Sequence, residues 1–300
     1  MERELTVCDI AIVIPTLNEE EAIGRVMDEI KEAMRQYKYQ VIVVDGHSTD
    51  NTVKIAKERG AVVLYQVRKG YGDALQLGFK YAYRKLKTPI TVMMDADGTY
   101  DPKDIPKLIK PIIEGKADLT IGNRFKNMEK GAMTLTNKVG NKILSWMARK
   151  ILKISIKDTQ SGFRAFRTST LKLLNLKTKG MPFATEMLAE ATQAAVRILE
   201  VPISYRRRIG KRKLNPLKDG LMILSVILRL ARDYQPLIFF GGPGIVFILG
   251  GILIGINVVV EWLTTGVITR LASVVLSALL IMTGIQLVSL GLVADMIKRR

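Results

Sequence analysis

Two uncharged segments near the C-terminal end constrain this 300-residue chain more than any other feature. Leu237–Val260 and Leu271–Ala294 each run for 24 residues without a charged side chain. A helix needs about 20 apolar residues to cross the hydrocarbon core of a bilayer. Buried helices of a soluble protein are the alternative. Two adjacent runs of this length favour a membrane hairpin instead, with spans at about 237–260 and 271–294.

Basic residues on either side of the hairpin predict its orientation. Arg229 and Arg232 precede the hairpin and three basic residues at 298–300 follow it, whereas the connecting loop at 261–270 holds one basic and one acidic residue. Lysine and arginine collect on the cytoplasmic side of membrane spans. We therefore expect a multi-pass protein of the cell membrane, with both termini and the large N-terminal region in the cytoplasm.

The segment before the hairpin predicts an amphipathic helix. Over Pro216–Tyr234, basic and polar residues lie within an arc of ~60° at the helical period, and apolar residues lie opposite. A basic stripe beside a broad apolar face suits the interface of an anionic leaflet. A helix packed on a globular core is the alternative. The interfacial position is favoured because the first span begins where this helix ends.

The first 205 residues alternate between strand and helix patterns. Strands are predicted at Asp9–Pro15, Gln40–Val44, Ala61–Tyr65, Ile90–Met94 and Ala117–Ile121, and helices at Glu19–Arg35, Asp50–Arg59, Gly72–Leu86 and Pro102–Glu114. Repeated βαβ units predict an α/β fold with a mostly parallel, Rossmann-like sheet that is covered on both faces. The chain then divides into a sheet domain at 1–205, a basic loop with a juxtamembrane helix at 206–235, and the hairpin at 236–300.

Polar residues follow four of the predicted strands. They are Thr16–Glu19, Asp45–Ser48, Asp95–Asp97 and Gly122–Arg124. Ligands of open α/β sheets bind beyond the carboxyl ends of the strands. The four segments therefore predict a site at one edge of the sheet.

Asp95 and Asp97 are the strongest local signal within this set. They follow an apolar strand at spacing i, i+2, so both carboxylates can reach one hard cation. Oxygen ligands suit Mg²⁺ or Mn²⁺, and such ions commonly neutralise a substrate diphosphate. A simple turn with Asp97 and Gly98 at its corner is the alternative, and both interpretations can hold together.

Composition limits the function classes. The chain has 46 Lys and Arg against 28 Asp and Glu, a net charge of +18, which requires an anionic partner such as nucleic acid, phosphorylated substrates or a membrane face. No nucleic-acid-binding module is recognisable and aromatic residues make up only 6%, so we expect no nucleic-acid partner.

One cysteine and one histidine exclude Cys-rich zinc sites and His-pair metal sites. Neither a P-loop nor a dinucleotide glycine motif is present. A channel or transporter subunit is disfavoured because the two spans carry few polar residues, and nothing indicates an oligomeric state.

Seven motifs, in order, resemble those of family-2 glycosyltransferases of the GT-A fold, in the dolichol-phosphate mannose synthase group. They are IPTLNEE at 14–20, VVDGHSTDNT at 43–52, RKGYGDAL at 68–75, MDADGTYDP at 94–102, IGNRF at 121–125, DTQSGFRAF at 158–166 and VPISYRRRIGKRKL at 201–214. The resemblance covers nearly the whole region before the predicted juxtamembrane helix. It departs from the group at Thr99, where relatives often carry a metal-binding Gln, and at Asn137 and Asn141, where they often carry Arg and Ser.

The resemblance implies a role for individual residues. It implies that the nucleotide sugar is bound by Pro15, Leu17, Glu19, Asp45, Lys69, Gly72, Asp95 and Lys213. It implies that Asp95 and Asp97 bind the metal, and that Arg124, Ser161 and Arg208 bind the acceptor phosphate. The implied catalytic residues are Asp97, Arg124 and Arg208. The implied reaction is an inverting, metal-dependent transfer of a hexose from a nucleotide sugar, with GDP-mannose first, to dolichyl or polyprenyl phosphate in the bilayer. UDP-glucose or UDP-N-acetylglucosamine as donor is the alternative. A polysaccharide-type synthase, with a hydroxyl acceptor and Glu186 as base, is less favoured.

Overall fold

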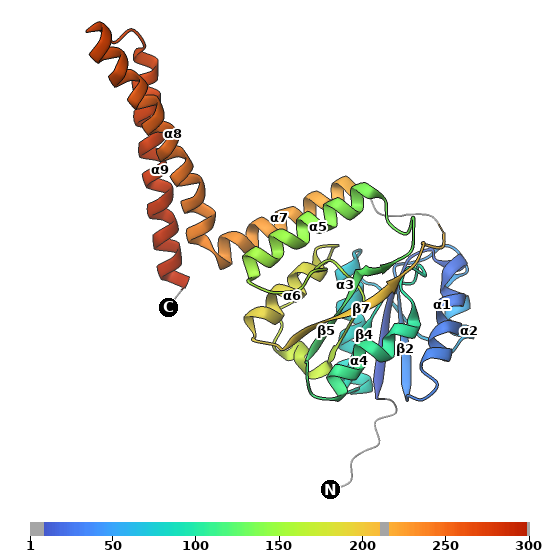
Figure 1. The fold of residues 1–300 in the computed structure, drawn as a ribbon. Helices are drawn as coiled ribbons and strands as arrows, with labels where there is room; N and C mark the ends of the chain where they lie inside the picture. The colour runs from blue at the N-terminus through green and yellow to red at the C-terminus, as the bar shows by residue number, and fades with distance from the viewer. Residues whose placement is uncertain (1–8, 211–215, 299–300) are drawn as a thin grey trace. The chain divides into compact units, whose positions relative to one another are not determined.

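The computed structural model describes residues 9–210 and 216–298, and its contacts divide the chain into two compact units. The first unit extends to Val226 and the second begins at Ile227. Figure 1 shows both units as a ribbon and labels most of their helices and strands. The functional division at 205 and 235 remains a prediction.

The first unit is built on one seven-stranded sheet. Its strands are β1 (Ile10–Thr16), β2 (Tyr39–Asp45), β3 (Val62–Tyr65), β4 (Ile90–Met93), β5 (Leu119–Met128), β6 (Arg164–Arg167) and β7 (Ile198–Tyr205). They are ordered β3-β2-β1-β4-β6-β5-β7. Among the described strands, β6 alone runs antiparallel to its neighbours, β4 and β5, and the other paired strands are parallel. The predicted mostly parallel sheet is confirmed.

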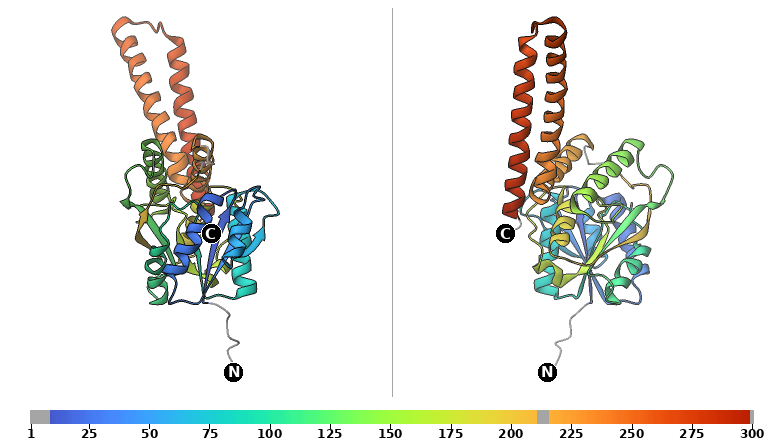
Figure 2. Two further views of the ribbon diagram at one scale, coloured as in Figure 1. Left: turned by 90° about the vertical axis from the view of Figure 1, so that its right-hand side faces the viewer. Right: turned by 60° about the vertical axis from the view of Figure 1, so that its left-hand side comes forward.

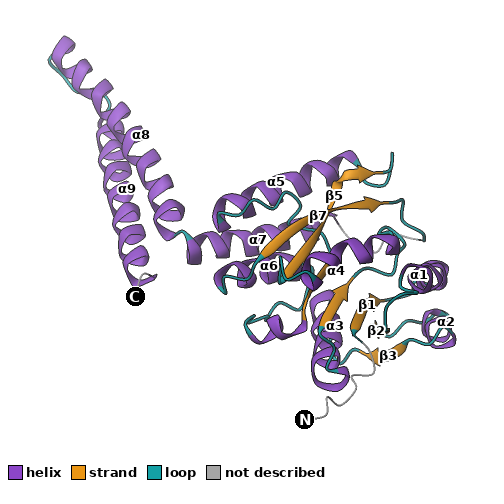
Figure 3. Ribbon diagram, turned by 60° about the horizontal axis from the view of Figure 1, so that its bottom comes forward, coloured by secondary structure: helices purple, strands orange, loops and turns teal. Residues whose placement is uncertain are grey.

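Helices cover both faces of this sheet (Figure 3). They are α1 (Glu20–Ala33), α2 (Thr52–Glu58), α3 (Tyr71–Tyr81), α4 (Ile105–Ile113), α5 (Leu135–Leu152) and α6 (Phe183–Gln193). Alternation along β1 sends Ile12 and Ile14 into a core shared with α1 and α4, while Val13 faces α3 on the other side. Because both faces are covered, the central strands are apolar along their whole length.

The predicted element boundaries hold within a few residues, with one consequential exception. The sequence pattern ends a strand at Ile121 and places Gly122–Arg124 in the loop beyond it. That prediction is wrong, because β5 continues to Met128. Parallel pairing with β7 resumes at Asn127 after an irregularity and extends the strand. Arg124 is therefore held inside the sheet.

The second unit contains two long apolar helices that pack against each other (Figure 2). They are α8 (Pro236–Thr265) and α9 (Leu271–Lys298), and both are long and apolar enough to cross a membrane. Both exceed the predicted spans, and Glu261 lies within α8 rather than in the connection. The helices approach closely at small residues: Ser277 Oγ donates a hydrogen bond to the Gly251 carbonyl at 2.7 Å. Small residues and buried hydroxyls are typical of contacts between membrane helices.

The boundary between the units falls within α7 (Pro216–Tyr234). This helix has the bounds predicted from its amphipathic pattern. Its position at a membrane interface remains a prediction.

Candidate active site

The loops after β1 and β2 are joined by hydrogen bonds at the carboxyl edge of the sheet. The backbone N–H of Asn18 donates to Ser48 Oγ at 2.8 Å, and the N–H of Thr49 donates to Asn18 Oδ1 at 2.7 Å. The buried Asp45 carboxylate accepts from the Ser48 N–H at 2.9 Å and from its hydroxyl at 2.5 Å. Asp45 therefore fixes the second loop, which in turn fixes the first. Two other residues of this region are predicted to bind the nucleotide sugar. Pro15 lies within β1, and Leu17 is exposed beyond the end of β1.

A second group of predicted nucleotide-side residues follows the end of β3. Lys69 is exposed, and Gly72 lies in the first turn of α3, where a Cβ atom would collide with the backbone of residues 178–179. Gln66 connects these residues to the loop after β2. Its N–H donates to the Asp45 carbonyl at 2.9 Å, and its side-chain amide donates to the carbonyl of the residue after Lys69 at 2.7 Å. The predicted nucleotide-side residues from three strand ends are thus connected.

Asp95 and Asp97 follow β4 at the centre of this edge. Burial, followed by the charge of Asp97, raises the pKa of Asp95 from 3.8 to about 7. The Tyr71 hydroxyl donates to Asp95 Oδ1 at 2.9 Å and opposes this rise. Asp97 Oδ1 accepts from the Thr99 N–H at 3.0 Å and from its hydroxyl at 2.6 Å. Thr99, the departure from the family pattern, therefore orients Asp97.

The two carboxylates have the chemistry of a site for a hard divalent cation. The charge of Asp97 disfavours the ionised form of Asp95, and a bound cation would relieve this repulsion. Within residues 9–210 and 216–298, no group of three or more His, Cys, Asp or Glu side chains forms a metal cluster. A cation held by Asp95 and Asp97 would therefore complete its coordination with water and substrate oxygens, as Mg²⁺ commonly does.

Arg208 approaches the same carboxylates from the far end of the unit. Its Nη1 donates to Asp97 Oδ2 at 2.9 Å and its Nη2 donates to Glu19 Oε1 at 2.6 Å. The Ile209 N–H, bonded to the Asp97 carbonyl at 2.9 Å, holds the tail on this loop. The structure thus brings together three predicted residues that are separated by up to 189 positions. Lys213, the remaining predicted residue of this tail, lies outside the described residues.

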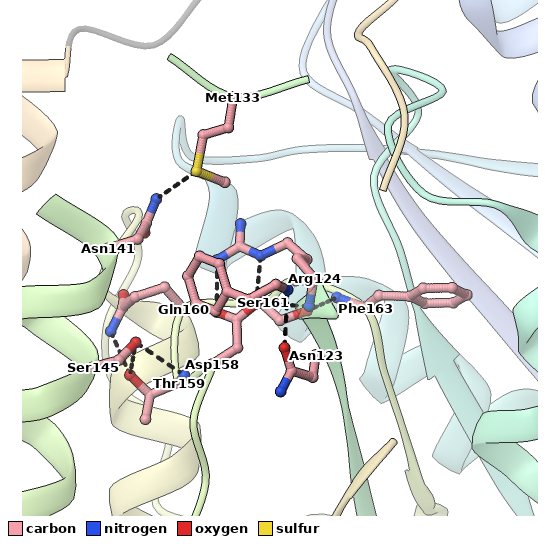
Figure 4. Close-up of polar contacts among 12 residues, drawn as sticks. Asn123, Arg124, Met133, Asn141, Ser145, Asp158, Thr159, Gln160, Ser161 and Phe163 are labelled. Carbon is pink, nitrogen blue, oxygen red and sulfur yellow. Dashed lines mark hydrogen bonds and ion pairs between the residues drawn. The ribbon is translucent and has the colours of Figure 1, made fainter. Parts of the chain in front are cut away.

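Arg124 is paired inside the protein (Figure 4). Its Nε and Nη2 donate to the two carboxylate oxygens of Asp158 at 2.7 and 2.8 Å, and its guanidinium lies 5.5 Å from the centre of the Tyr205 ring. Burial opposes the charge of Arg124, but the Asp158 carboxylate, Tyr100 and Tyr205 together outweigh burial and hold the pKa of Arg124 well above its ordinary value. The sequence motifs contained Asp158 but did not single it out. The role of Arg124 toward an acceptor phosphate remains a prediction.

The segment after Asp158 passes close to Asp95. Ser161 is buried, and the Gly162 N–H donates to the Tyr100 hydroxyl at 2.8 Å. A Cβ atom on Gly162 would lie 2.9 Å from the Tyr71 hydroxyl and 3.3 Å from Asp95 Oδ2. Only glycine lets the backbone approach the carboxylate this closely.

Arg164 is a second residue that the motifs contained but did not single out. It is fully buried, and its guanidinium donates to the carbonyls of Ser161 and Thr159, each at 2.9 Å. Burial lowers the pKa of Arg164 to about 10. This side chain fixes the 159–161 segment from beneath.

Glu186 has a structural role at the start of α6. Its carboxylate accepts from the Lys177 N–H at 3.1 and 3.2 Å and from the Thr178 N–H at 2.9 Å. These bonds fix the loop that packs on Gly72. On α5, the Asn141 amide lies 3.6 Å from Met133 Sδ (Figure 4), and Asn137 bonds through its backbone to the capping Thr134.

The sheet order and the carboxylate pair after β4 define an α/β enzyme of the GT-A type. Residues 11–174 match the glycosyl transferase family 2, and the chain belongs to that family. It is a glycosyltransferase.

Similar proteins include three archaeal relatives and one solved structure. Glycosyltransferase AglJ of Haloferax volcanii is 32% identical over 290 residues, covering 96% of this chain and 93% of the relative. A dolichyl-phosphate hexose transferase of the same organism is 34% identical over 77% of this chain and 97% of its own length. A UDP-N-acetylglucosamine–dolichyl-phosphate N-acetylglucosaminyltransferase of Methanococcus voltae is 36% identical over 65% of this chain and 84% of its own. The fold matches glucosyl-3-phosphoglycerate synthase of Mycobacterium tuberculosis with a TM-score of 0.60 and 24% identity, over 74% of this chain and 80% of that one.

Proposed function

We propose that this protein transfers a hexose from a nucleotide sugar to dolichyl or polyprenyl phosphate, with inversion at the sugar carbon. The observation that carries the proposal is the placement of Asp95, Asp97 and Arg208 together at the carboxyl edge of the sheet. Two similar archaeal proteins, a dolichyl-phosphate hexose transferase and a UDP-N-acetylglucosamine–dolichyl-phosphate N-acetylglucosaminyltransferase, support the acceptor class.

In this proposal Asp95 and Asp97 hold Mg²⁺ or Mn²⁺. The bound ion supplies positive charge for the diphosphate leaving group. The solved structure of the same fold contains Mn²⁺ and UDP. Arg208 is positioned to add a second positive charge beside Asp97, and its forked guanidinium suits contacts with phosphate oxygens.

A lipid phosphate is ionised at neutral pH, so it needs orientation rather than a general base. The state of Glu186 favours this acceptor over a sugar hydroxyl. Its carboxylate is occupied by backbone N–H groups of Lys177 and Thr178, which makes it a poor candidate base. The hydroxyl-acceptor alternative would require Glu186 to leave these bonds.

The donor is proposed at the level of its class. GDP-mannose follows from the family resemblance, whereas the name of the Methanococcus voltae relative supports UDP-N-acetylglucosamine. UDP-glucose is the third candidate. In the same proposal α8 and α9 cross the cell membrane, and the catalytic unit and both termini face the cytoplasm.

The test is transfer of radiolabelled sugar into organic-extractable lipid by the purified full chain in a bilayer. Each of the three donors is offered with polyprenyl phosphate and Mg²⁺ or Mn²⁺. We expect one donor to label the lipid, and we expect Asp97→Asn to abolish labelling. Asp28→Asn, which changes an exposed carboxylate on α1, is the matched control. Labelling by none of the donors, or unchanged turnover of Asp97→Asn, would overturn the proposal.

A further inference from the structure

A basic groove lies between β5 and α5. Its volume is about 550 Å³, and it is lined by Asn123, Phe125, Lys126, Lys142, Ile143, Trp146, Arg149 and Lys157. We define Lys126, Lys142, Arg149 and Lys157 as the groove cations. None of the described residues that line the groove is acidic. Glu200 is the carboxylate bonded to this lining, and it accepts hydrogen bonds from the Asn123 amide and from the backbone N–H of Lys157, not from a side-chain cation. The Nε atom of Arg149 is buried without a hydrogen-bond partner in the described part of the chain.

The groove is distinct from the candidate active site. Successive side chains of a strand point to opposite faces, so Asn123 and Phe125 line the groove while Arg124 between them faces Asp158. Asn123 bonds Glu200 at 3.0 Å on the groove side. The strand β5 itself therefore separates the two sites.

The exposed face of α5 continues the groove as an apolar stripe. Four exposed apolar residues form this stripe: Leu135, Val139, Ile143 and Trp146. They fall within an arc of ~80° at 100° per residue, and the exposed fraction of Trp146 is 54%. Lys142 and Arg149 lie along one border of this stripe. The whole of α5 contains four basic residues and no acidic one. A tryptophan beside lysines at the edge of an apolar face is typical of the headgroup region of a membrane.

We infer that the groove binds the anionic headgroup of a bilayer phospholipid, with the upper part of its acyl chains along the apolar stripe of α5. The charge of the groove cations complements a phosphodiester, and the unpartnered Nε of Arg149 offers a donor for it. The chain carries helices long enough to cross a membrane, so bilayer lipid is available at high effective concentration. The site differs from the acceptor site of the proposed function and does not depend on it.

Fluorescence of Trp146 provides a test in the full-length protein. The chain has two tryptophans, so Trp262→Phe leaves Trp146 as the reporter. This variant is reconstituted in bilayers of phosphatidylcholine and phosphatidylglycerol. In one sample the acyl chains of the phosphatidylcholine carry bromine, and in the other those of the phosphatidylglycerol do. The mole fraction of brominated lipid is the same in both samples. We expect brominated phosphatidylglycerol to quench Trp146 more strongly than brominated phosphatidylcholine.

Charge removal distinguishes a built site from diffuse attraction. Lys142→Gln with Lys157→Gln should weaken the phosphatidylglycerol preference by about fivefold per charge removed. Lys80→Gln with Lys103→Gln makes the same change at exposed lysines outside the groove and should leave the preference intact. An unchanged Trp146 emission spectrum in phosphatidylcholine alone shows that the variants retain their fold.

Three results would overturn the inference. Equal quenching by the two brominated lipids would show that the groove does not select an anionic headgroup. Loss of the quenching difference in millimolar inorganic phosphate would assign the groove to free phosphate. Loss of the difference on adding a trace of polyprenyl phosphate would assign it to the acceptor. Survival of the difference in both competitions supports the phospholipid site.

Discussion

The raised pKa of Asp95 predicts how cation binding depends on pH. An acid with a pKa of about 7 is mostly protonated at pH 6 and mostly ionised at pH 8. A carboxylate must be ionised to ligate a metal, so the affinity for Mn²⁺ should fall as the pH drops below 7. A single proton with this pKa weakens apparent binding about tenfold between pH 8 and pH 6. An unperturbed aspartate, with a pKa near 3.9, would give no pH dependence in this range.

Isothermal titration of the full chain with Mn²⁺ measures this effect directly. At pH 6, repetition in buffers of different ionisation enthalpy should show release of about 0.9 proton per bound ion, falling to about 0.1 at pH 8. Tyr71→Phe removes the hydroxyl that donates to Asp95 at 2.9 Å and lowers its pKa. A hydrogen bond to a charged group contributes about 1.5–3 kcal/mol, so the midpoint should move up by about one to two pH units.

Two results would refute this reasoning. Mn²⁺ affinity that is constant from pH 6 to pH 8 would mean that Asp95 is already ionised, and that burial beside Asp97 does not govern it. A midpoint that falls in Tyr71→Phe would mean that the hydroxyl stabilises the protonated carboxyl rather than the ionised one. Tyr83→Phe, in the short π-helix Ala82–Leu86 that follows α3, is a control that should leave the midpoint unchanged.

Three further changes test other parts of the site. Arg208→Gln should lower kcat/KM for sugar transfer about 10- to 100-fold, because it removes a cation, and its charge-assisted hydrogen bonds to phosphate, from beside the leaving group of the proposed reaction. Asp158→Asn should destabilise the protein by about 3–5 kcal/mol, seen as a lower thermal midpoint, because it leaves the buried Arg124 without its counter-charge. Gly162→Ala should abolish transfer with little change in the thermal midpoint, because its Cβ would press on Tyr71 and Asp95.

Each of these changes has a matched control. Arg207→Gln alters a neighbouring arginine that bonds the 129–130 segment and should retain activity. Pairing Asp158→Asn with Arg124→Gln should restore part of the lost stability, because the unpaired charge is gone. Gly140→Ala adds a Cβ that meets no atom of another described segment within 4 Å, and it should retain transfer. Equal loss in variant and control would contradict the corresponding argument.

The sequence predicts those features that depend on local pattern. The first four strands, the covering helices α1 to α4 and the bounds of α7 follow from the periodicity of apolar residues. The strands β6 and β7 are not predicted from the sequence. The strand β6 has only four residues, and β7 mixes buried and exposed positions irregularly. The continuation of β5 to Met128 depends on pairing with β7, almost 80 residues later. Polar side chains such as Asn123 and Arg124 resemble a strand end when that partner is unknown.

The charge pairs show most clearly what the sequence leaves open. A family motif can mark Arg124 as a residue of the acceptor side, but it does not reveal that both arms of the guanidinium are taken by Asp158. Arg208 illustrates the converse. The family resemblance implies a position near the phosphates, and the structure adds that its guanidinium forms ion pairs with Glu19 and Asp97. A divalent cation and a diphosphate would compete for these same groups. Under the proposed function, donor binding exchanges the Arg208–Asp97 contact for Arg208–phosphate and Asp97–metal contacts, so the binding of the donor and of the metal should be cooperative. Mn²⁺ should bind more tightly in the presence of the nucleoside diphosphate, and Arg208→Gln should reduce that coupling while strengthening the binding of Mn²⁺ alone.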